Sequence, residues 1–268
     1  MDTDLVGKIG LITGGSTGVG LGIATALAKE GVHLAIASRN PEQHGLESLS
    51  ALGTKVLPLS VDVSKEDQVV RMVQETIEGL GGLDLYINNA AAHWDELATQ
   101  LTSEGWMNSL NTNLSACVWA CREVSRHFIR QGHGSILIVG STAQFHPAHK
   151  ETGYRVSKTG LRVYMEVLSI ELAPFNIRVN MLTPGSFPSK LRSEFLKVRG
   201  ITDKDPAATR HIPFRRVGKL EEIGPTAALL LSDKLSGFTT GADFVVDGGS
   251  HLRPLPLMSD EEIRRQSV

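Results

Sequence analysis

Residues 8–20, KIGLITGGSTGVG, join a short apolar run to a glycine-rich turn. Residues 8–13 have the composition of a strand buried on both faces, and residues 18–30 have the apolar pattern of a helix. Glycines permit a sharp turn and let main-chain N–H groups approach an anion closely. The N-terminal end of the helix favours a phosphate at the same place. This segment therefore predicts the first strand, the phosphate-binding turn and the first helix of a dinucleotide-binding α/β fold.

Apolar runs and amphipathic stretches alternate along the rest of the chain. The apolar runs are rich in Val, Ile and Leu without polar alternation, which is typical of parallel strands covered on both faces. We therefore expect one Rossmann-type α/β domain over residues 1–268, a doubly wound parallel sheet of about seven strands with helices on both faces. The expected strands are 8–13, 32–38, 55–61, 83–88, 135–140, 177–182 and 242–246, and the expected helices are 18–30, 41–52, 65–80, 103–130, 152–172 and 220–231.

Residues 186–215 interrupt this rhythm. They contain Pro188, Gly200, Pro206 and Pro213, several charges and few apolar periods. Irregular segments beside a rigid scaffold often cover a binding site. We expect a substrate-binding loop here, near the carboxyl edge of the sheet.

Composition narrows the possible functions. A chain of 268 residues with a formal net charge of -2 and no long basic run is not expected to bind nucleic acid. No stretch approaches the roughly 20 apolar residues of a membrane span, so we expect no membrane partner. The first residues, MDTD, are acidic, unlike a secretory signal, and indicate a cytoplasmic protein. Cys117 and Cys121 lie four apart on an expected helix, where small core-filling residues are the favoured interpretation over a disulfide framework.

Two motifs carry a family resemblance. The turn reads Thr-Gly-x-x-x-Gly-x-Gly from Thr13 to Gly20, and Tyr154 and Lys158 have the spacing Tyr-x-x-x-Lys. With these motifs the chain resembles the short-chain dehydrogenase/reductase family over nearly its whole length. The resemblance implies an oxidoreductase that transfers a hydride between NADP(H) and a carbonyl or alcohol substrate, with a ketone reductase favoured. It implies that these residues bind the cofactor: Gly14, Ser16, Thr17, Gly18, Val19, Gly20, Ser38, Arg39, Asp62, Val63, Asn89, Ala90, Tyr154, Lys158, Pro184, Gly185, Phe187 and Ser189.

The end of the second strand predicts which dinucleotide binds. In this fold a carboxylate there would bond the ribose hydroxyls and repel a 2′-phosphate. The sequence has Ser38, Arg39 and Asn40 instead, and the Arg39 guanidinium suits a phosphate. We expect NADP(H), chiefly because the acid is missing. An exposed loop arginine and a preference for NAD remain the alternative.

Two other turns depart from the family pattern. Ala91 stands where the family's Asn-Asn-Ala-Gly turn has its glycine, and Ser189 replaces a threonine after an unusual Phe187-Pro188. Asp62 resembles the family's adenine-contacting aspartate, and Val63 would contribute its backbone. A role for Asp62 in starting the next helix is the structural alternative.

Asn113, Ser141, Tyr154 and Lys158 are the expected catalytic residues. Tyr154 and Lys158 share one helical face, a spacing that also arises by chance. A free phenol has a pKa of about 10. We expect the Lys158 ammonium to lower that pKa, so that Tyr154 serves as acid in reduction and base in oxidation. Ser141 would hold the carbonyl oxygen. The resemblance alone implies that Asn113 anchors a water serving Lys158 and that Lys158 holds the nicotinamide ribose.

Other interpretations stay open. His93, His146 and His149 line a polar pocket or face solvent, and no metal is expected because their spacing is unlike that of zinc ligands. Residues 253–268 dock on a neighbouring subunit or are loose, and the resemblance implies a dimer or tetramer, with a homotetramer favoured. A non-catalytic NADP(H) sensor, a methyltransferase and an NAD-dependent sugar or polyol dehydrogenase are the competing functions.

Overall fold

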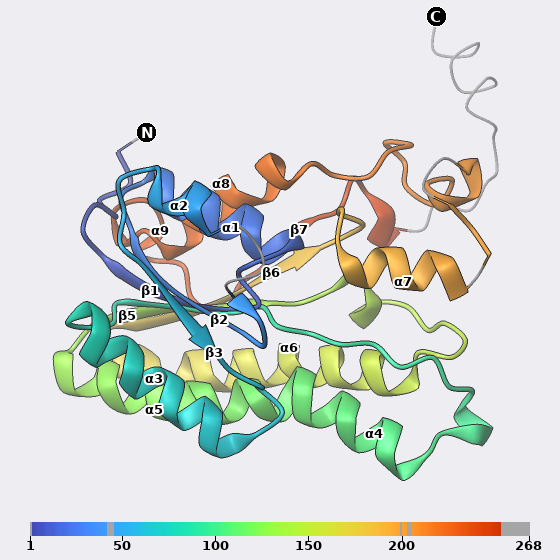
Figure 1. Cartoon of the computed structure of the whole chain (residues 1–268), viewed down its shortest axis with the longest axis horizontal. Coiled ribbons are helices and arrows are strands. Elements are labelled where there is room, and N and C mark those ends of the chain that lie inside the picture. The colour runs from blue at the N-terminus through green and yellow to red at the C-terminus, as the bar shows by residue number, and fades with distance from the viewer. Residues whose placement is uncertain (1, 42–45, 199, 203–204, 253–268) are drawn as a thin grey trace, which may run out of the picture.

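The computed structural model contains a seven-stranded parallel sheet in the order β3-β2-β1-β4-β5-β6-β7 (Figure 1). It describes residues 2–41, 46–198, 200–202 and 205–252. The order reverses between β1 and β4, so the chain winds outward in two directions from the centre of the sheet. This confirms the predicted doubly wound fold. The strands are β1 (Ile9–Thr13), β2 (His33–Ser38), β3 (Val56–Ser60), β4 (Leu85–Asn88), β5 (Gly134–Val139), β6 (Ile177–Pro184) and β7 (Asp243–Val246).

Helices cover both faces of this sheet. On one face lie α1 and α8, and on the other lie α3, α5 and α6 (Figure 1). Successive strand residues belong to opposite cores: in β5, Ile136 and Ile138 pack towards α5, whereas Leu137 packs towards α8. This explains why the strands read as unbroken apolar runs. The helices are α1 (Gly18–Lys29), α2 (Glu47–Ser50), α3 (Glu66–Leu80), α4 (Ser103–Leu110), α5 (Ala116–Gln131), α6 (Thr152–Leu172), α7 (Lys190–Val198), α8 (Leu220–Leu231) and α9 (Asp233–Ser236).

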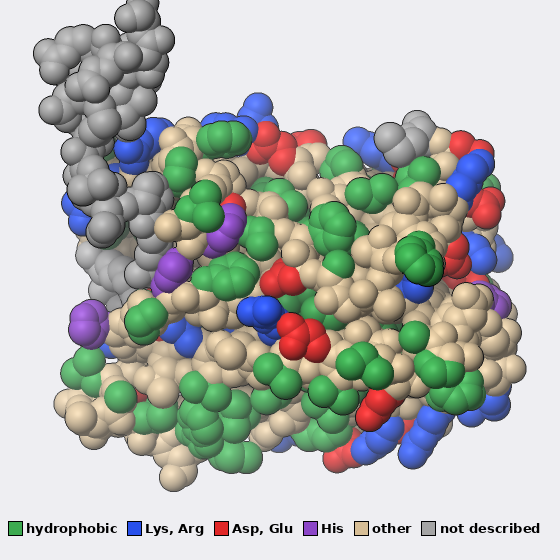
Figure 2. Space-filling model, turned by 180° about the vertical axis from the view of Figure 1, so that it is seen from behind, with side chains coloured by type: hydrophobic (Ala, Val, Ile, Leu, Met, Phe, Trp, Pro, Cys, Tyr) green, Lys and Arg blue, Asp and Glu red, His purple; other side chains and the backbone are tan. Residues whose placement is uncertain are grey.

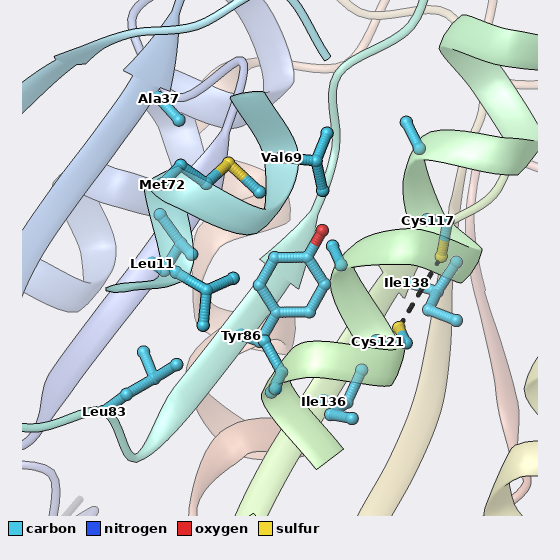
Figure 3. Packing of buried hydrophobic residues seen from close by; sticks show 14 of the residues in the cluster. Leu11, Ala37, Val69, Met72, Leu83, Tyr86, Cys117, Cys121, Ile136 and Ile138 are labelled. Atoms are coloured by element: carbon cyan, nitrogen blue, oxygen red, sulfur yellow. Dashed lines mark hydrogen bonds between the residues drawn. The ribbon is translucent and has the colours of Figure 1, made fainter. Parts of the chain in front are cut away.

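Cys117 and Cys121 belong to the core between α5 and the sheet (Figure 3). Both are free and fully buried, and their Sγ atoms are 3.8 Å apart. Tyr86 and Ile138 pack in the same cluster. The prediction that these cysteines fill the core is confirmed.

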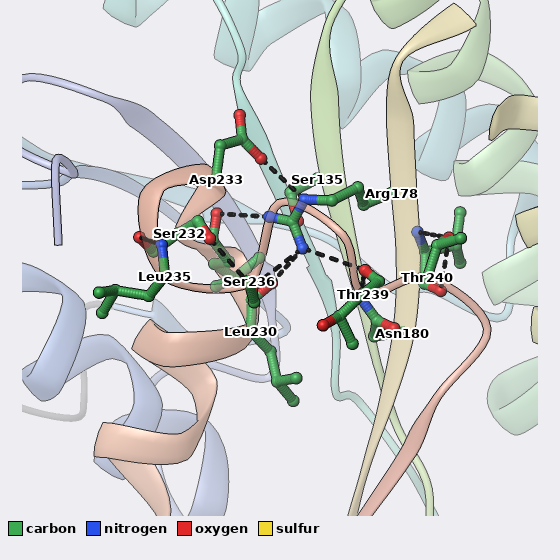
Figure 4. Close-up of polar contacts among 12 residues, drawn as sticks. Ser135, Arg178, Asn180, Leu230, Ser232, Asp233, Leu235, Ser236, Thr239 and Thr240 are labelled. Atoms are coloured by element: carbon green, nitrogen blue, oxygen red, sulfur yellow. Dashed lines mark hydrogen bonds and ion pairs between the residues drawn. The ribbon is translucent and has the colours of Figure 1, made fainter. Parts of the chain in front are cut away.

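Arg178 ties β6 to the end of α8 (Figure 4). Its side chain is 8 % exposed and donates to the main-chain carbonyls of Leu230 and Leu231 over 2.7 and 3.1 Å. It also bonds Ser135 on β5 and Asp233 on α9. The guanidinium therefore binds the carbonyls left open at the C-terminal end of α8.

The structure corrects three expected elements. The helix expected over 103–130 is two α-helices joined by a π-helical turn at Asn111–Ser115. The expected loop 186–215 contains α7. Of the helix expected over 41–52, only Glu47–Ser50 is α-helical, and residues 42–45 lie outside the described part, as does the predicted tail 253–268. None of the helices in the described ranges is both long and apolar enough to cross a lipid bilayer.

Candidate active site

The carboxyl ends of β1 and β4 are joined where the strand order reverses. Thr13 Oγ1 accepts from the main-chain N–H groups of Asn89 and Ala90 over 3.0 and 3.1 Å. The Asn89 side-chain amide donates to the carbonyls of Thr13 and Gly14, each over 3.0 Å. In open α/β sheets this crevice is where ligands bind. The predicted residues Asn89 and Ala90 therefore hold the start of the glycine turn through hydrogen bonds to Thr13 and Gly14.

The glycines of this turn leave little room for side chains at their own positions. A Cβ atom on Gly20 would lie 2.2 Å from the Gly14 carbonyl oxygen and 2.5 Å from Asn89 Nδ2. Gly14 and Gly18 have φ angles of 66° and 55°, which favour glycine. Thr17 is the N-cap of α1, but its side chain makes no capping hydrogen bond. The turn thus keeps main chain close to the start of α1, as an anion cradle requires.

The predicted adenosine end lies across β2 and β3. Ser16 Oγ is 3.3 Å from Ser38 Oγ at the end of β2, and the next residue, Arg39, is exposed. Asp62 Oδ1 accepts from the main-chain N and the Oγ of Ser64, over 3.0 and 2.8 Å. The N-cap of α3 is Lys65, so Asp62 braces the turn before the helix. Val63 beside it is buried.

The predicted nicotinamide end lies after β6. Pro184 ends this strand, and Gly185 packs so closely on Asp247 that an added Cβ would be 2.6 Å from the Asp247 Cβ. Phe187 is buried. Ser189 Oγ accepts from the main-chain N of Arg192 over 3.1 Å and so caps the start of α7. The Cβ of Ser189 would be 2.9 Å from a Cβ built on Gly18, so the segment after β6 lies against the glycine turn. Val19, next to Gly18, and Ser189 line one cavity.

Tyr154 and Lys158 lie on α6, beside Ser141 at the end of β5. Lys158 Nζ lies 5.9 Å from the centre of the Tyr154 ring and donates to the Val139 carbonyl over 2.9 Å. The Ser141 hydroxyl lies close enough to the Tyr154 phenol to lower the pKa of that phenol. The helix therefore brings three of the four predicted catalytic side chains together at the sheet edge.

Burial dominates the acidity of this group of side chains. It raises the pKa of the Tyr154 phenol, against the nearby Ser141 hydroxyl, which lowers it. Burial also lowers the pKa of Lys158 to about 8. The prediction that Lys158 brings the Tyr154 pKa down is wrong for this structure, because the cost of placing a phenolate in a dry site is the largest influence. At neutral pH Tyr154 keeps its proton and Lys158 keeps its charge.

Asn113 lies in the π-helical turn between α4 and α5 and is fully buried. Its side-chain amide bonds the main chain of Ala92, accepting over 2.8 Å and donating over 2.9 Å. It also donates to Ser157 Oγ over 3.2 Å. The amide thus joins the loop after β4 to α6, next to Lys158. The hydrogen bonds of this amide within the described part of the chain go to Ala92 and Ser157, and Lys158 is not among its partners.

A cavity of about 530 Å³ opens beside Tyr154. His93, His146 and His149 all line it, and His93 stands edge-on to the Tyr154 ring with their centres 5.3 Å apart. Figure 2 shows histidine side chains gathered at the end of the molecule that carries α7. Within the described ranges, no three His, Cys, Asp or Glu side chains gather as metal ligands.

Sequence reasoning missed some lining residues. They include Thr142 and Arg155. Arg155 could have been found, because it is next to Tyr154 on the helix. Leu191, Arg192, Leu196 and His211 also line the cavity, and they fall within the predicted substrate-binding loop 186–215.

Known dehydrogenases and reductases resemble this chain over most of its length. The family model described as enoyl-(acyl carrier protein) reductase matches residues 14–251. A 3-oxoacyl-(acyl-carrier-protein) reductase from Chlamydia pneumoniae is 34% identical over 254 residues, covering 93% of this chain and 99% of that protein. A short-chain type dehydrogenase/reductase from Mycobacterium marinum superposes with a TM-score of 0.84 at 29% identity, over 92% and 96% of the two chains.

An NAD+-bound xylitol dehydrogenase superposes equally well. Its TM-score is 0.84 at 27% identity, with 91% of this chain and 99% of that chain covered. Relatives of this kind bind a nicotinamide cofactor, and the glycine turn, the sheet order and the Tyr154–Lys158 pair fit that chemistry. The chain is therefore an oxidoreductase of the short-chain dehydrogenase/reductase family.

Proposed function

We propose that this protein is an NADP(H)-dependent carbonyl reductase that uses Tyr154 as its proton donor. The observation that carries the proposal is the grouping of Tyr154, Lys158 and Ser141 at the mouth of a cavity that also reaches the glycine turn. A dinucleotide sensor would need the turn but not this grouping. A methyltransferase would need an acid at the ribose, where Ser38 and Arg39 stand.

The glycine turn fits the pyrophosphate of a dinucleotide. The close approach of Gly20 to the Gly14 carbonyl and the start of α1 support this fit. Residues 184–189 and Lys158 would hold the nicotinamide half, with Asp62, Val63, Asn89 and Ala90 along the adenine half. When bound, the nicotinamide supplies or accepts the hydride.

The choice of NADP(H) rests on the end of β2. Ser16 and Ser38 offer hydroxyl groups there, and Arg39 offers an exposed cation. Together these groups suit a 2′-phosphate. The NAD+ in the xylitol dehydrogenase structure supports the alternative of an NAD-dependent polyol dehydrogenase, and the two are separated by cofactor titration.

The protonation states favour reduction. A carbonyl that receives a hydride becomes an alkoxide and needs a proton. Tyr154, whose pKa burial raises, holds that proton at neutral pH. The Ser141 hydroxyl donates to the same oxygen as charge develops. Asn113 fixes the loop after β4 and the adjacent turn of α6, so these groups stay aligned.

A ketone is the proposed substrate class. The cavity combines apolar side chains such as Phe187 and Leu196 with histidines, which suits a carbonyl compound with both apolar and polar parts. The Chlamydia pneumoniae relative is named as a reductase of 3-oxoacyl groups, which supports reduction of a ketone carbon.

We also propose that the chain acts as a single domain in the cytoplasm and assembles into a homo-oligomer. Val156, Val163, Val167 and Ile170 of α6 are each at least 46 % exposed. Figure 2 shows hydrophobic side chains over the lower part of the molecule, where α4 and α6 lie. Light scattering tests the assembly, and a monomer in solution would contradict it.

Tyr154→Phe tests the function. Oxidation of NADPH by a panel of ketones, sugars and 3-oxoacyl thioesters is followed by absorbance. The variant should lose roughly 100- to 10,000-fold in kcat while NADPH fluorescence titration shows unchanged binding. Full activity in Tyr154→Phe, or no NADPH binding by the native chain, would reject the proposal. Binding without turnover of any substrate would favour the sensor.

A further inference from the structure

Glu151, the N-cap residue of α6, and Arg155 in its first turns form an ion pair on either side of Tyr154 in the sequence. Arg155 Nη2 lies 2.7 Å from Glu151 Oε2, and the two side chains are 17 % and 4 % exposed. Both line the cavity. By contrast, the Arg162–Glu166 pair with the same spacing, further along α6, is 49 % and 46 % exposed. A nearly buried ion pair costs desolvation energy, so its place beside the reacting phenol calls for a reason other than stability.

A second nitrogen of the Arg155 guanidinium holds a loop. Arg155 Nη1 donates to the Ala143 carbonyl over 2.9 Å and also contacts the His146 carbonyl. Both carbonyls belong to the loop of residues 141–149, which begins at Ser141 and forms one wall of the cavity. A planar guanidinium can bond a carboxylate and two carbonyls at once, whereas an ammonium on a lysine stem cannot match this geometry.

The loop 141–149 is also anchored to the sheet through the Gln144 side chain. Gln144 Nε2 donates to Asp243 Oδ2 over 2.7 Å and to Thr183 Oγ1 over 3.2 Å. These partners lie on β7 and β6. The loop is therefore fixed to the sheet through Gln144 and to α6 through Arg155, with Ser141 at its start.

We propose that Glu151 and Arg155 are a positioning pair that holds the loop 141–149 against α6 and balances the charge around the Tyr154 hydroxyl. This inference rests on the proposed function, because it assigns the pair to the same site. The pair acts through Ser141 and Tyr154 and takes no part in bond making.

The charged and titratable groups that face Tyr154 come from three directions. Lys158 and Arg155 share its helix, Glu151 is the N-cap residue at the start of that helix, and His93 approaches from the loop after β4. The Ser141 hydroxyl faces it from the end of β5. Glu151 raises the pKa of Tyr154 and Arg155 lowers it, so removing one charge at a time moves that pKa in opposite directions.

An alkaline titration of tyrosinate absorbance tests this without any substrate. The chain has three tyrosines. Burial raises the pKa of all three phenols above the usual value. Subtracting the titration of Tyr154→Phe identifies the Tyr154 signal.

We expect the pH midpoint of the Tyr154 titration to be lower in Glu151→Gln and higher in Arg155→Met than in the native protein. Arg155→Lys keeps the charge, so its midpoint stays near that of the native protein, but the loop is released. We expect both Arg155 variants to lose roughly 10- to 100-fold in kcat/KM, because Ser141 is misplaced. Arg162→Met and Glu166→Gln, the matched exposed pair, should change neither quantity.

Two results would overturn the inference. One is a Tyr154 midpoint that does not move, or moves the same way, in Glu151→Gln and Arg155→Met. The other is a folded Arg155→Lys with native kcat/KM. If Arg155→Met does not fold, Glu151→Gln and Arg155→Lys still decide the matter. If the native chain reduces no carbonyl compound, the proposed function fails, yet the titration still reports on the pair.

Discussion

Lys158 Nζ donates a 2.9 Å hydrogen bond to the carbonyl oxygen of Val139, the last residue of β5. The lysine is 2 % exposed, and burial lowers its pKa from 10.5 to about 8. The ammonium that the chemistry needs is therefore held at a cost to folding. That cost is characteristic of residues kept for function rather than stability.

Lys158→Met should stabilise the protein at neutral pH while abolishing activity. Between its folded pKa of about 8 and the usual 10.5, the unfolded chain binds more protons, so native stability rises with pH across this window. Below pH 8 the native protein bears the full cost of keeping the buried Lys158 charged, which is about 3 kcal/mol in the free energy of unfolding. The hydrogen bond to Val139 offsets about 1 kcal/mol of the gain in the variant.

Urea denaturation at several pH values measures this difference. The variant's advantage should shrink as the pH rises above 8 and vanish near 10.5. Lys29→Met, at an exposed position on α1, is the control and should show no such trend. An advantage that does not depend on pH would mean that packing, not charge, explains it.

Gly20→Ala should disrupt the dinucleotide cradle. The added methyl group would lie 2.2 Å from the Gly14 carbonyl oxygen, so the turn must shift. We expect a loss of about 1–3 kcal/mol in stability from overpacking, together with weaker NADPH binding. Calorimetric titration with NADPH measures the second effect. Gly82→Ala, whose Cβ would meet only Ile9 Cδ1 at 3.5 Å, should bind NADPH normally.

The fold was predictable because its signals are local. Residues 8–20 combine a strand, a turn and a helix start, and Tyr154 and Lys158 are fixed by helical spacing. The π-helical turn around Asn113 was not predictable, because apolar periodicity does not report which carbonyl each N–H bonds. The strong effect of burial on Tyr154 also depends on distant segments that close over it.

The missed helix α7 shows how prolines and a glycine misled the prediction. Pro188, Gly200, Pro206 and Pro213 together predict an irregular segment over 186–215. In the structure Ser189 follows Pro188 and caps the helix by accepting from the Arg192 N–H. Proline just before a serine cap is compatible with a helix start, since the proline itself stays outside. The cofactor residues near Arg39 and Ser189 remain predictions.

Ser38→Asp should shift the cofactor preference from NADPH towards NADH. A carboxylate at the end of β2 would repel a 2′-phosphate and accept hydrogen bonds from ribose hydroxyls. Arg39→Ala should weaken NADPH binding by removing the cation, with NADH affected little. The ratio of KM values for the two cofactors measures both changes. If Arg39→Ala leaves the KM for NADPH unchanged, Arg39 is a solvated loop residue and the NADP(H) assignment loses its support.

Arg178→Met should destabilise the protein without affecting the chemistry. It removes the donors that bond the Leu230 and Leu231 carbonyls at the end of α8 (Figure 4). Buried carbonyls left without partners cost about 1–3 kcal/mol each, so we expect a loss of about 3–5 kcal/mol in the free energy of unfolding. The partner Asp233 is 63 % exposed, so the ion pair itself contributes little.

Denaturant unfolding and kcat per folded molecule are the two measurements for Arg178→Met. Arg126→Met is the control, because Arg126 is 61 % exposed and pairs with Glu123 on the surface of α5. Its effect should stay within about 0.5 kcal/mol. Arg178 bonds residues at the N-terminal end of β5 and the C-terminal end of α8. The Tyr154 site lies beyond the C-terminal end of β5, at the opposite end of the strands. A fall in kcat of the folded Arg178→Met protein would show that the two ends are coupled, and this is the outcome that would contradict the prediction.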